Sequence, residues 1–194
     1  SNLKRRVGES MRACGLQEVQ SLTLSNERDQ FEHVRWPNEG YVTEIANPIT
    51  SDHTLLRQYI LPSLLRLLAA NRHHELPQRV YELGNVIRDS KNFPRAAWAC
   101  AEVGSGFTSS KGIVQALLRD MGAIQDDVEF RPTDAEDGPW ISGRGSHVFI
   151  GDEKIGEFGE IDPRVSGLFG NKSPIQAGEI DLEAIYRIVP DPIS

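Results

Sequence analysis

Cysteine is scarce in this sequence of 194 residues, and long apolar runs are missing from it. Cys14 and Cys100 lie far apart and form no CxxC pair, which disfavours both a disulfide scaffold and a zinc site. No apolar stretch approaches the roughly 20 residues that a helix needs to cross a bilayer, and no signal-peptide pattern is present. We therefore expect buried thiols, a cytoplasmic location and no membrane partner.

Basic residues are also in deficit. Lys and Arg number 21 against 28 Asp and Glu, so the net charge is −7. A protein whose main task is to bind nucleic-acid phosphates needs a basic face, and this balance disfavours that class. The densest basic run is Lys4, Arg5 and Arg6, with Arg12 nearby. A solvated helix face explains such a run more simply than a phosphate contact, which stays open as an alternative.

Motifs for catalysis or metal binding are few. The stretch 104–112, GSGFTSSKG, is not a phosphate-binding loop, because that loop needs Gly directly before Lys and Ser or Thr after it. His73 and His74 diverge by about 100° on a helix, so they cannot easily share a metal. The acids at 126–127 and 134–137 are expected in loops, where solvated charge is the default and a weak cation site is the alternative. Nothing in these residues demands catalysis.

The most informative stretch runs from Asn47 to Asp89 and predicts an apolar helix followed at once by a strand. Pro62 belongs in the first turn of a helix, because it cannot donate a backbone hydrogen bond. Around it, apolar residues recur at three- and four-residue steps and form one face: Leu61, Leu64, Leu65 and Leu68. A polar break follows at 71–78, and the next strand is expected at 80–87.

The remaining pattern predicts one α+β domain at 3–194. Ser1 and Asn2 are expected to be a tag remnant, and the chain is expected to be a fragment of a longer protein. A helix is expected at 3–14, where Leu3, Val7, Met11 and Cys14 repeat at helical spacing. Further helices are expected at 26–34, 110–121 with Ser110 as cap, and 163–168. Strands are expected at 19–24, 41–46, 96–103, 147–150, 155–159 and 175–182, with a turn at 36–40 and a mobile loop at 132–145. The Gly151-Asp152 pair indicates a hairpin, so the expected fold is a mostly antiparallel sheet flanked by helices.

The segment NPITSDHTLLRQYILPSLLRLLAAN, at 47–71, and YELG, at 81–84, resemble the β subunit of phenylalanyl-tRNA synthetase of archaeal type. The resemblance covers about Leu3 to Ile185 and concerns the C-terminal catalytic-like module of that subunit. It implies the class II synthetase fold, an antiparallel sheet of six to seven strands with three signature motifs.

The first signature motif is a helix and a strand used for subunit contact, and the segment Leu3 to Leu24 resembles it. The Pro that usually closes this motif is absent, and Leu22 or a neighbour stands in its place. The resemblance implies that apolar helix faces contact a partner subunit. The expected interface residues are Leu3, Val7, Met11, Leu61, Leu64, Leu65 and Leu68.

The second and third motifs supply the arginines that bind ATP in the family. Arg88 stands in the place of the first arginine, but Ser90 replaces the acid that helps to position ATP. In the third motif, Glu183 stands where the second arginine belongs, and the next arginine is Arg187. A carboxylate facing a triphosphate is repulsive. Arg88 is therefore at most a vestigial ATP-site residue, and no catalytic or metal-binding residue is predicted.

The resemblance as a whole implies a non-catalytic module that supports assembly with the catalytic α subunit into an α2β2 heterotetramer. The whole enzyme would use ATP and magnesium and would bind tRNA(Phe), while this fragment would bind no cofactor itself. Two alternatives remain: a synthetase paralogue that retains ATP or amino-acid binding through Arg88, and a module that contacts tRNA through Lys4, Arg5, Arg6 and Arg12.

Overall fold

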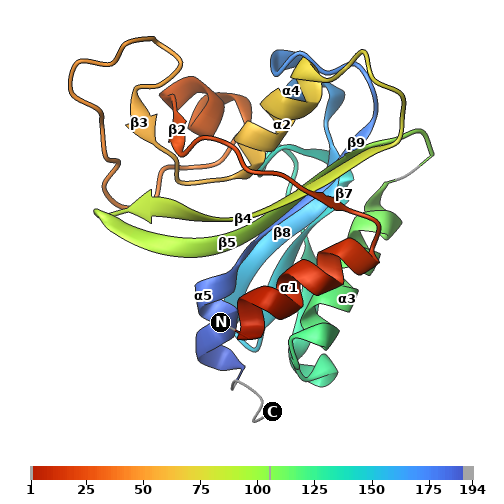
Figure 1. Cartoon of the computed structure of the whole chain (residues 1–194). Helices are drawn as coiled ribbons and strands as arrows, with labels where there is room; N and C mark the ends of the chain where they lie inside the picture. The colour runs from red at the N-terminus through yellow and green to blue at the C-terminus, as the bar shows by residue number, and fades with distance from the viewer. Residues whose placement is uncertain (1, 105, 190–194) are drawn as a thin grey trace.

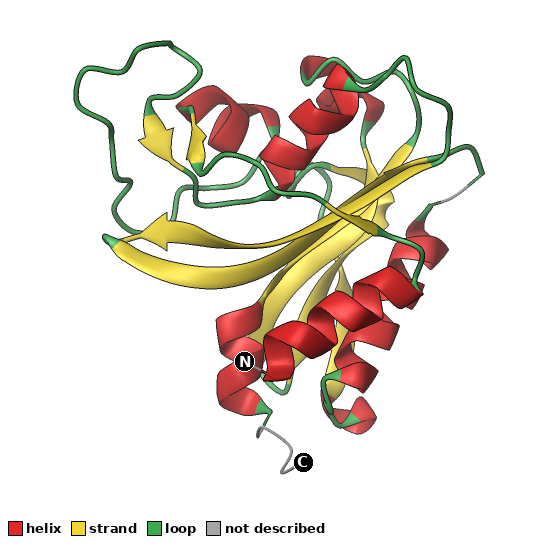
Figure 2. Ribbon diagram, viewed as in Figure 1, coloured by secondary structure: helices red, strands yellow, loops and turns green. Residues whose placement is uncertain are grey.

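A seven-stranded sheet forms the middle layer of the molecule, with helices on both faces (Figure 1, Figure 2). The computed structural model describes residues 2–104 and 106–189. Only the β1–β4 pair is parallel, and the other neighbouring strands are antiparallel. The predicted α+β class with a mostly antiparallel sheet is therefore confirmed. In sheet order the strands are β1 (Gln17–Glu18), β4 (Gln78–Arg88), β5 (Lys91–Ala101), β9 (Ile175–Asp181), β8 (Glu153–Ile161), β7 (Trp140–Ile150) and β6 (Val128–Pro132).

Two sets of smaller elements cover the two faces of the sheet. One face packs against three helices: α1 (Asn2–Ala13), α3 (Phe107–Asp120) and α5 (Leu182–Ile188). The other face carries α2 (Leu61–Ala70), α4 (Pro163–Leu168), the π-helix η1 (Arg28–His33) and a small ladder of β2 (Leu24–Ser25) with β3 (Leu55–Leu56). A short 3-10 turn, η2 (Gln125–Asp127), precedes β6. No helix among the described residues is both long and apolar enough to cross a bilayer.

Strand β5 lies in the interior of the sheet, and this position explains its unbroken run of small apolar residues. Ala96, Trp98 and Cys100 point into the core on the α1 side, while Ala97 and Ala99 point into the core on the α2 side. A strand that is covered on both faces has no solvent side and needs no polar alternation. The predicted buried strand at 96–103 is thus confirmed, although it begins earlier, at Lys91, and ends at Ala101.

Where the sequence pattern is strong, the predicted elements are confirmed by the structure. The helices expected at 3–14, 61–70 and 163–168 correspond to α1, α2 and α4, and Pro62 lies in the first turn of α2. The hairpin expected at Gly151-Asp152 joins β7 to β8, where Ile150 pairs with Glu153.

Where the sequence pattern is weaker, several predicted elements differ from the structure. The stretch 41–46 makes only one isolated bridge, Glu44 to Leu55, because the neighbouring strand β3 is only two residues long. Strand structure near 19–24 is limited to β1 before it and β2 at its end. β7 begins at Trp140, inside the stretch expected to be a mobile loop. Helix α3 begins at Phe107, so Ser110 lies within the helix, fully buried, rather than capping it.

The seven apolar residues expected at a subunit interface lie in the chain's own core. None of their side chains is more than 5% exposed, because α1 packs against α3 and the sheet while α2 packs on the opposite face. These side chains are therefore not available to another subunit, and any contact must use other residues. The seven are Leu3, Val7, Met11, Leu61, Leu64, Leu65 and Leu68.

Candidate functional site

A small cavity lies on the α2 face of the sheet, at the end of β4 where the sequence places Arg88. Its volume is about 200 Å³. Strands β4, β5, β8 and β9 contribute to its floor, and the segment 36–39 contributes to its wall. The charged side chains around it are Glu39, Arg88, Arg95, Asp137, Lys154, Glu157, Glu179 and Asp181.

Arg88 is held by its own chain at this cavity. Its Nη1 lies 2.7 Å from Glu39 Oε2, and its guanidinium lies 4.4 Å from the centre of the Phe93 ring. The next two residues, Asp89 and Ser90, have φ angles of 52° and 60° and form the two-residue turn between β4 and β5. Ser90 therefore stands in a tight hairpin turn, without the acid that the family uses there.

Glu179 and Arg95 form a buried ion pair on the floor, where Arg95 Nε donates to Glu179 Oε2 at 2.5 Å. Glu179 is 1% exposed and also accepts from the backbone N–H groups of Ile60 and Leu61, at the N-terminus of α2. A helix N-terminus favours negative charge, so α2 and Arg95 together compensate this carboxylate. Burial alone lowers the pKa of Arg95, but Glu179 and Asp181 outweigh burial and the pKa is raised.

The segment 36–40 is fixed across this cavity by hydrogen bonds from several elements. Trp36 Nε1 donates to Glu157 Oε1 at 3.2 Å, and Tyr59 Oη donates to the Pro37 carbonyl at 2.5 Å. Gln58 exchanges two hydrogen bonds of 2.8 Å with the backbone of Glu39. Burial raises the pKa of Tyr59, as does the nearby Glu39 carboxylate, so its hydroxyl stays a donor. The segment is thus part of the packed structure.

Glu157 is a second carboxylate of the site that accepts several hydrogen bonds from this chain. Its Oε1 accepts from Trp140 Nε1 at 2.8 Å as well as from Trp36, and its Oε2 accepts from Lys154 Nζ at 2.7 Å. His147 lies beside it, with Nδ1 at 3.8 Å from Oε2. Glu157 therefore accepts three hydrogen bonds from side chains of this chain.

The charges that line this cavity are unfavourable for a triphosphate. Each of its three cations is paired with a carboxylate of the same cavity, namely Arg88 with Glu39, Arg95 with Glu179 and Lys154 with Glu157. Asp137 and Asp181 add two further acids, so a triphosphate would meet a net negative lining. The volume is also smaller than the about 300–1,000 Å³ of ordinary ligand pockets.

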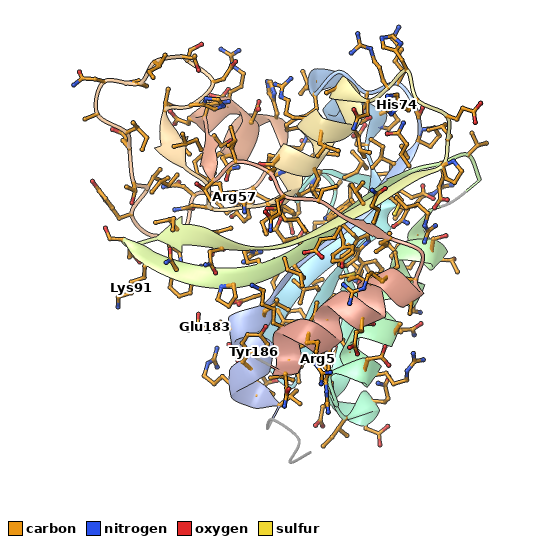
Figure 3. All side chains as sticks on the ribbon, in the orientation of Figure 1. Arg5, Arg57, His74, Lys91, Glu183 and Tyr186 are labelled. Carbon is orange, nitrogen blue, oxygen red and sulfur yellow. The ribbon has the colours of Figure 1, made fainter. Side chains whose placement is uncertain are left out.

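The residues expected at the third motif lie away from this cavity. Glu183 is exposed in the first turn of α5, and Arg187 forms an ion pair with Glu153 at 2.6 Å. Figure 3 shows Glu183 on the opposite side of the sheet from Arg57, which belongs to the α2 face. Neither Glu183 nor Arg187 lines the cavity that contains Arg88.

The basic run of α1 is partly engaged in local ion pairs. Arg5 points away from the sheet (Figure 3) and lies 3.8 Å from Glu9. Arg12 lies 3.8 Å from Glu18 and donates to Tyr81 Oη. These pairs reduce the positive charge that α1 can offer to a phosphate.

The other candidates from the sequence are two histidines and two cysteines, and within the described residues they form neither a metal site nor an activated nucleophile. His73 and His74 are exposed in the turn after α2, and the described residues contain no group of three His, Cys, Asp or Glu placed to hold a metal. Burial raises the pKa of Cys100 to about 12, and burial also raises the pKa of Cys14. Neither thiol is poised as a nucleophile.

Sequence reasoning missed most of the paired charges of the α2 face. One signal was available for Glu179, which is an acid between apolar residues of the buried strand β9. Arg57 and Glu82 form a second buried pair, 2.9 Å apart with both side chains at most 3% exposed. No spacing rule connects Trp36 to Glu157, because these partners are distant in the sequence.

Three comparisons with known proteins agree with this architecture. The family model described as the phenylalanyl tRNA synthetase beta chain CLM domain matches residues 1–182. The phenylalanine–tRNA ligase beta subunit of Archaeoglobus fulgidus is 33% identical over 188 residues, which cover 96% of this chain and 34% of that protein. The beta subunit of Pyrococcus horikoshii is 37% identical, covering 93% of this chain and 33% of that protein.

A solved structure supports the fold. The pyrrolysyl tRNA synthetase PylSc of Desulfitobacterium hafniense has a TM-score of 0.78 at 14% sequence identity, covering 96% of this chain and 67% of that chain. At this identity the likeness shows the class II synthetase fold alone. The chain spans about a third of the length of the curated relatives it matches. By the family match and by these relatives, the chain belongs to the phenylalanyl-tRNA synthetase β chain family.

Proposed function

We propose that this chain is a non-catalytic, synthetase-like module of a phenylalanine–tRNA ligase β subunit. Its role is to support assembly with the catalytic α subunit, in an α2β2 enzyme that aminoacylates tRNA(Phe) in the cytoplasm. One observation carries the proposal: the cations of the cavity at Arg88 are paired with carboxylates of the same cavity, which segment 36–39 partly covers.

The chemistry of adenylate formation supports this assignment. That reaction needs cationic groups placed where charge develops on the phosphates. Here Arg88 is committed to Glu39, and Ser90 and Glu183 stand in place of an acid and an arginine. In this proposal ATP and magnesium are used by the whole enzyme, at the α subunit, and this module binds neither.

Assembly has to use side chains other than the seven apolar residues expected from the sequence, since those are buried in this chain. The two alternatives have weaker support. A paralogue that binds ATP would have to break the Arg88–Glu39 pair, and a tRNA contact through α1 would have to compete with the Arg5–Glu9 and Arg12–Glu18 pairs.

The test combines two measurements on the purified chain. Light scattering after size exclusion, with the cognate α subunit added, is expected to show a stable complex, and ATP–pyrophosphate exchange by this chain alone is expected to be absent. Phenylalanine-dependent exchange without α would support the ATP-binding alternative. A chain that forms no complex with α would contradict the assembly role.

A further inference from the structure

A groove separate from the Arg88 cavity lies beside α2. It has a volume of about 530 Å³ and shares no lining residue with that cavity. Its walls are segment 21–26, residues 52–53 and the outer side of α2, which lie together on one side of the sheet (Figure 1). The groove is therefore a separate surface feature, distinct from the cavity at Arg88.

Apolar side chains form part of the lining of the groove, beside polar ones such as Ser63 and His53. Pro62 is buried at its base, Leu24 and Leu67 are half-buried, and Leu22 is 60% exposed. Nearby, on the same loop as residues 52–53, Ile49 is fully exposed. Single exposed aliphatic residues are ordinary on a protein surface, but here several leucines gather around one hollow, as at protein interaction sites.

The rim of the groove is acidic. A second hollow of about 310 Å³ continues the first and shares Asn26, Asp29, Asp52 and Arg66 with it. Asp29 is neutralised by Arg66, whose Nη2 lies 2.8 Å from Oδ1.

Three other acids of the rim have no such partner. Glu27, Glu32 and Asp52 are exposed and form no ion pair within the described part of the chain. Among the cations that line the second hollow, only Arg28 forms no ion pair within the described part of the chain. The rim thus keeps a negative charge beside the apolar side chains of the groove.

We propose that this groove docks a basic segment of a partner subunit, in which an aliphatic side chain is flanked by Lys or Arg. The inference rests on the proposed function, because it names a surface through which assembly with α takes place. The aliphatic side chain fills the space between Leu22 and Leu67, and the flanking cations lie against Glu27, Glu32 and Asp52. Opposite charges at a rim mainly speed association and set specificity.

A second copy of this chain is a poorer occupant. Its net charge of −7 opposes self-association at an acidic rim. Its densest basic run, at 4–6 on α1, offers no exposed aliphatic neighbour, because Leu3 and Val7 are buried.

The first experiment reverses the charge of the rim in the chain assembled with its cognate α subunit. The groove variant is Glu27→Lys/Glu32→Lys/Asp52→Lys. The matched control, Asp126→Lys/Asp127→Lys/Asp152→Lys, changes the net charge equally at exposed residues of η2 and the β7–β8 turn. We expect the groove variant to bind α at least tenfold more weakly at low salt, with a flatter salt dependence, while the control binds as the wild type does.

The second experiment identifies the occupant. A photoreactive benzoylphenylalanine replaces Leu22 in the complex, and a control copy carries it at Leu168, which is 52% exposed on α4. We expect Leu22 to cross-link to an α peptide in which Lys or Arg flanks an aliphatic residue.

The outcomes separate this inference from the proposed function. A groove variant that binds α as tightly as the control overturns the inference and leaves the assembly role intact. A cross-link from Leu22 to a second copy, or to the β chain itself, also overturns it. A wild-type chain that does not bind α overturns both.

Discussion

Glu179 shows how single residues determine what the sheet cleft can do. A carboxylate at this depth needs several donors, and it receives them from Arg95 and from the first turn of α2. The same residue therefore starts a helix, neutralises an arginine and lines the cavity. A charge bound in this way is committed to the fold and is not free to meet a ligand.

Glu179→Ala is expected to destabilise the chain by about 3–5 kcal/mol, because it leaves Arg95 buried without a partner. Urea unfolding at pH 7 measures this loss. Glu153→Ala is the matched control, since it breaks the exposed Glu153–Arg187 pair and should cost less than about 1 kcal/mol. Equal losses in the two variants would contradict the structural role of Glu179.

Asp162 makes stability depend on pH. Hydrogen bonds from Arg164 lower the pKa of Asp162 from 3.8 to about 2, with a further contribution from Arg35 that acts against burial. The folded chain therefore keeps this carboxylate ionised where the unfolded chain binds a proton. The stabilisation is present above about pH 4 and is lost as the pH falls through about 2.

The prediction for Asp162→Asn is a flatter decline of the unfolding free energy between about pH 4 and pH 2 than in the wild type. Denaturant titrations at several pH values provide the comparison. A variant with the same pH slope as the wild type in this interval would show that Asp162 is not the group responsible.

At the scale of elements, the segment 36–40 forms one wall of the cavity on this face of the sheet. Gly40 contributes through its backbone, because its φ is 64° and a Cβ there would lie 2.5 Å from Asp89 Oδ2. The Asp89 carboxylate in turn accepts from the backbone N–H of Tyr41 at 2.6 Å. The hairpin turn of β4 and β5 and the loop after Trp36 therefore hold each other in place.

Trp36→Phe removes the indole donor to Glu157 while keeping an aromatic side chain. We expect a loss of about 1 kcal/mol in stability and faster amide hydrogen exchange at 37–41. Exchange measured by mass spectrometry on the folded chain tests this. If exchange at 37–41 were unchanged while the rest of the chain behaved alike, the Trp36–Glu157 contact would not anchor the segment.

Local patterns predicted the elements whose own residues decide their structure. Helix α2 has its proline at the start and leucines on one face, so nothing outside it was needed to find it. The stretch 41–46 has a strand-like composition, but a strand also needs a neighbour, and only Glu44 finds one. Helix α3 begins before Ser110 because Phe107 packs against Phe158 and its N–H meets Glu160, which are contacts far along the chain.

For the whole molecule, the sequence located the site through Arg88 but could not describe it. Arg88 was found by the resemblance of residues 87–90 to the second motif of the family, whereas its partner Glu39 lies in a separate loop. The same limit applies to the apolar helix faces. Periodicity shows that a face is covered, and it does not show whether the cover is the same chain or another subunit.

Leu64→Asp tests whether the apolar face of α2 is buried by this chain itself or by another subunit. Leu64 is fully buried in the core between α2 and the sheet, so a charge there should unfold the chain rather than only prevent assembly. Circular dichroism of the isolated chain gives the answer. A variant that folds normally and only fails to bind α would place Leu64 at the interface instead.

We propose that this synthetase-like module binds no nucleotide. Isothermal titration calorimetry of magnesium ATP into the purified chain measures this. We expect no saturable heat up to millimolar concentrations, in the wild type and in Arg88→Ala alike. Saturable binding that Arg88→Ala weakens would overturn the proposal, because it would mean that Arg88 leaves Glu39 to bind phosphate.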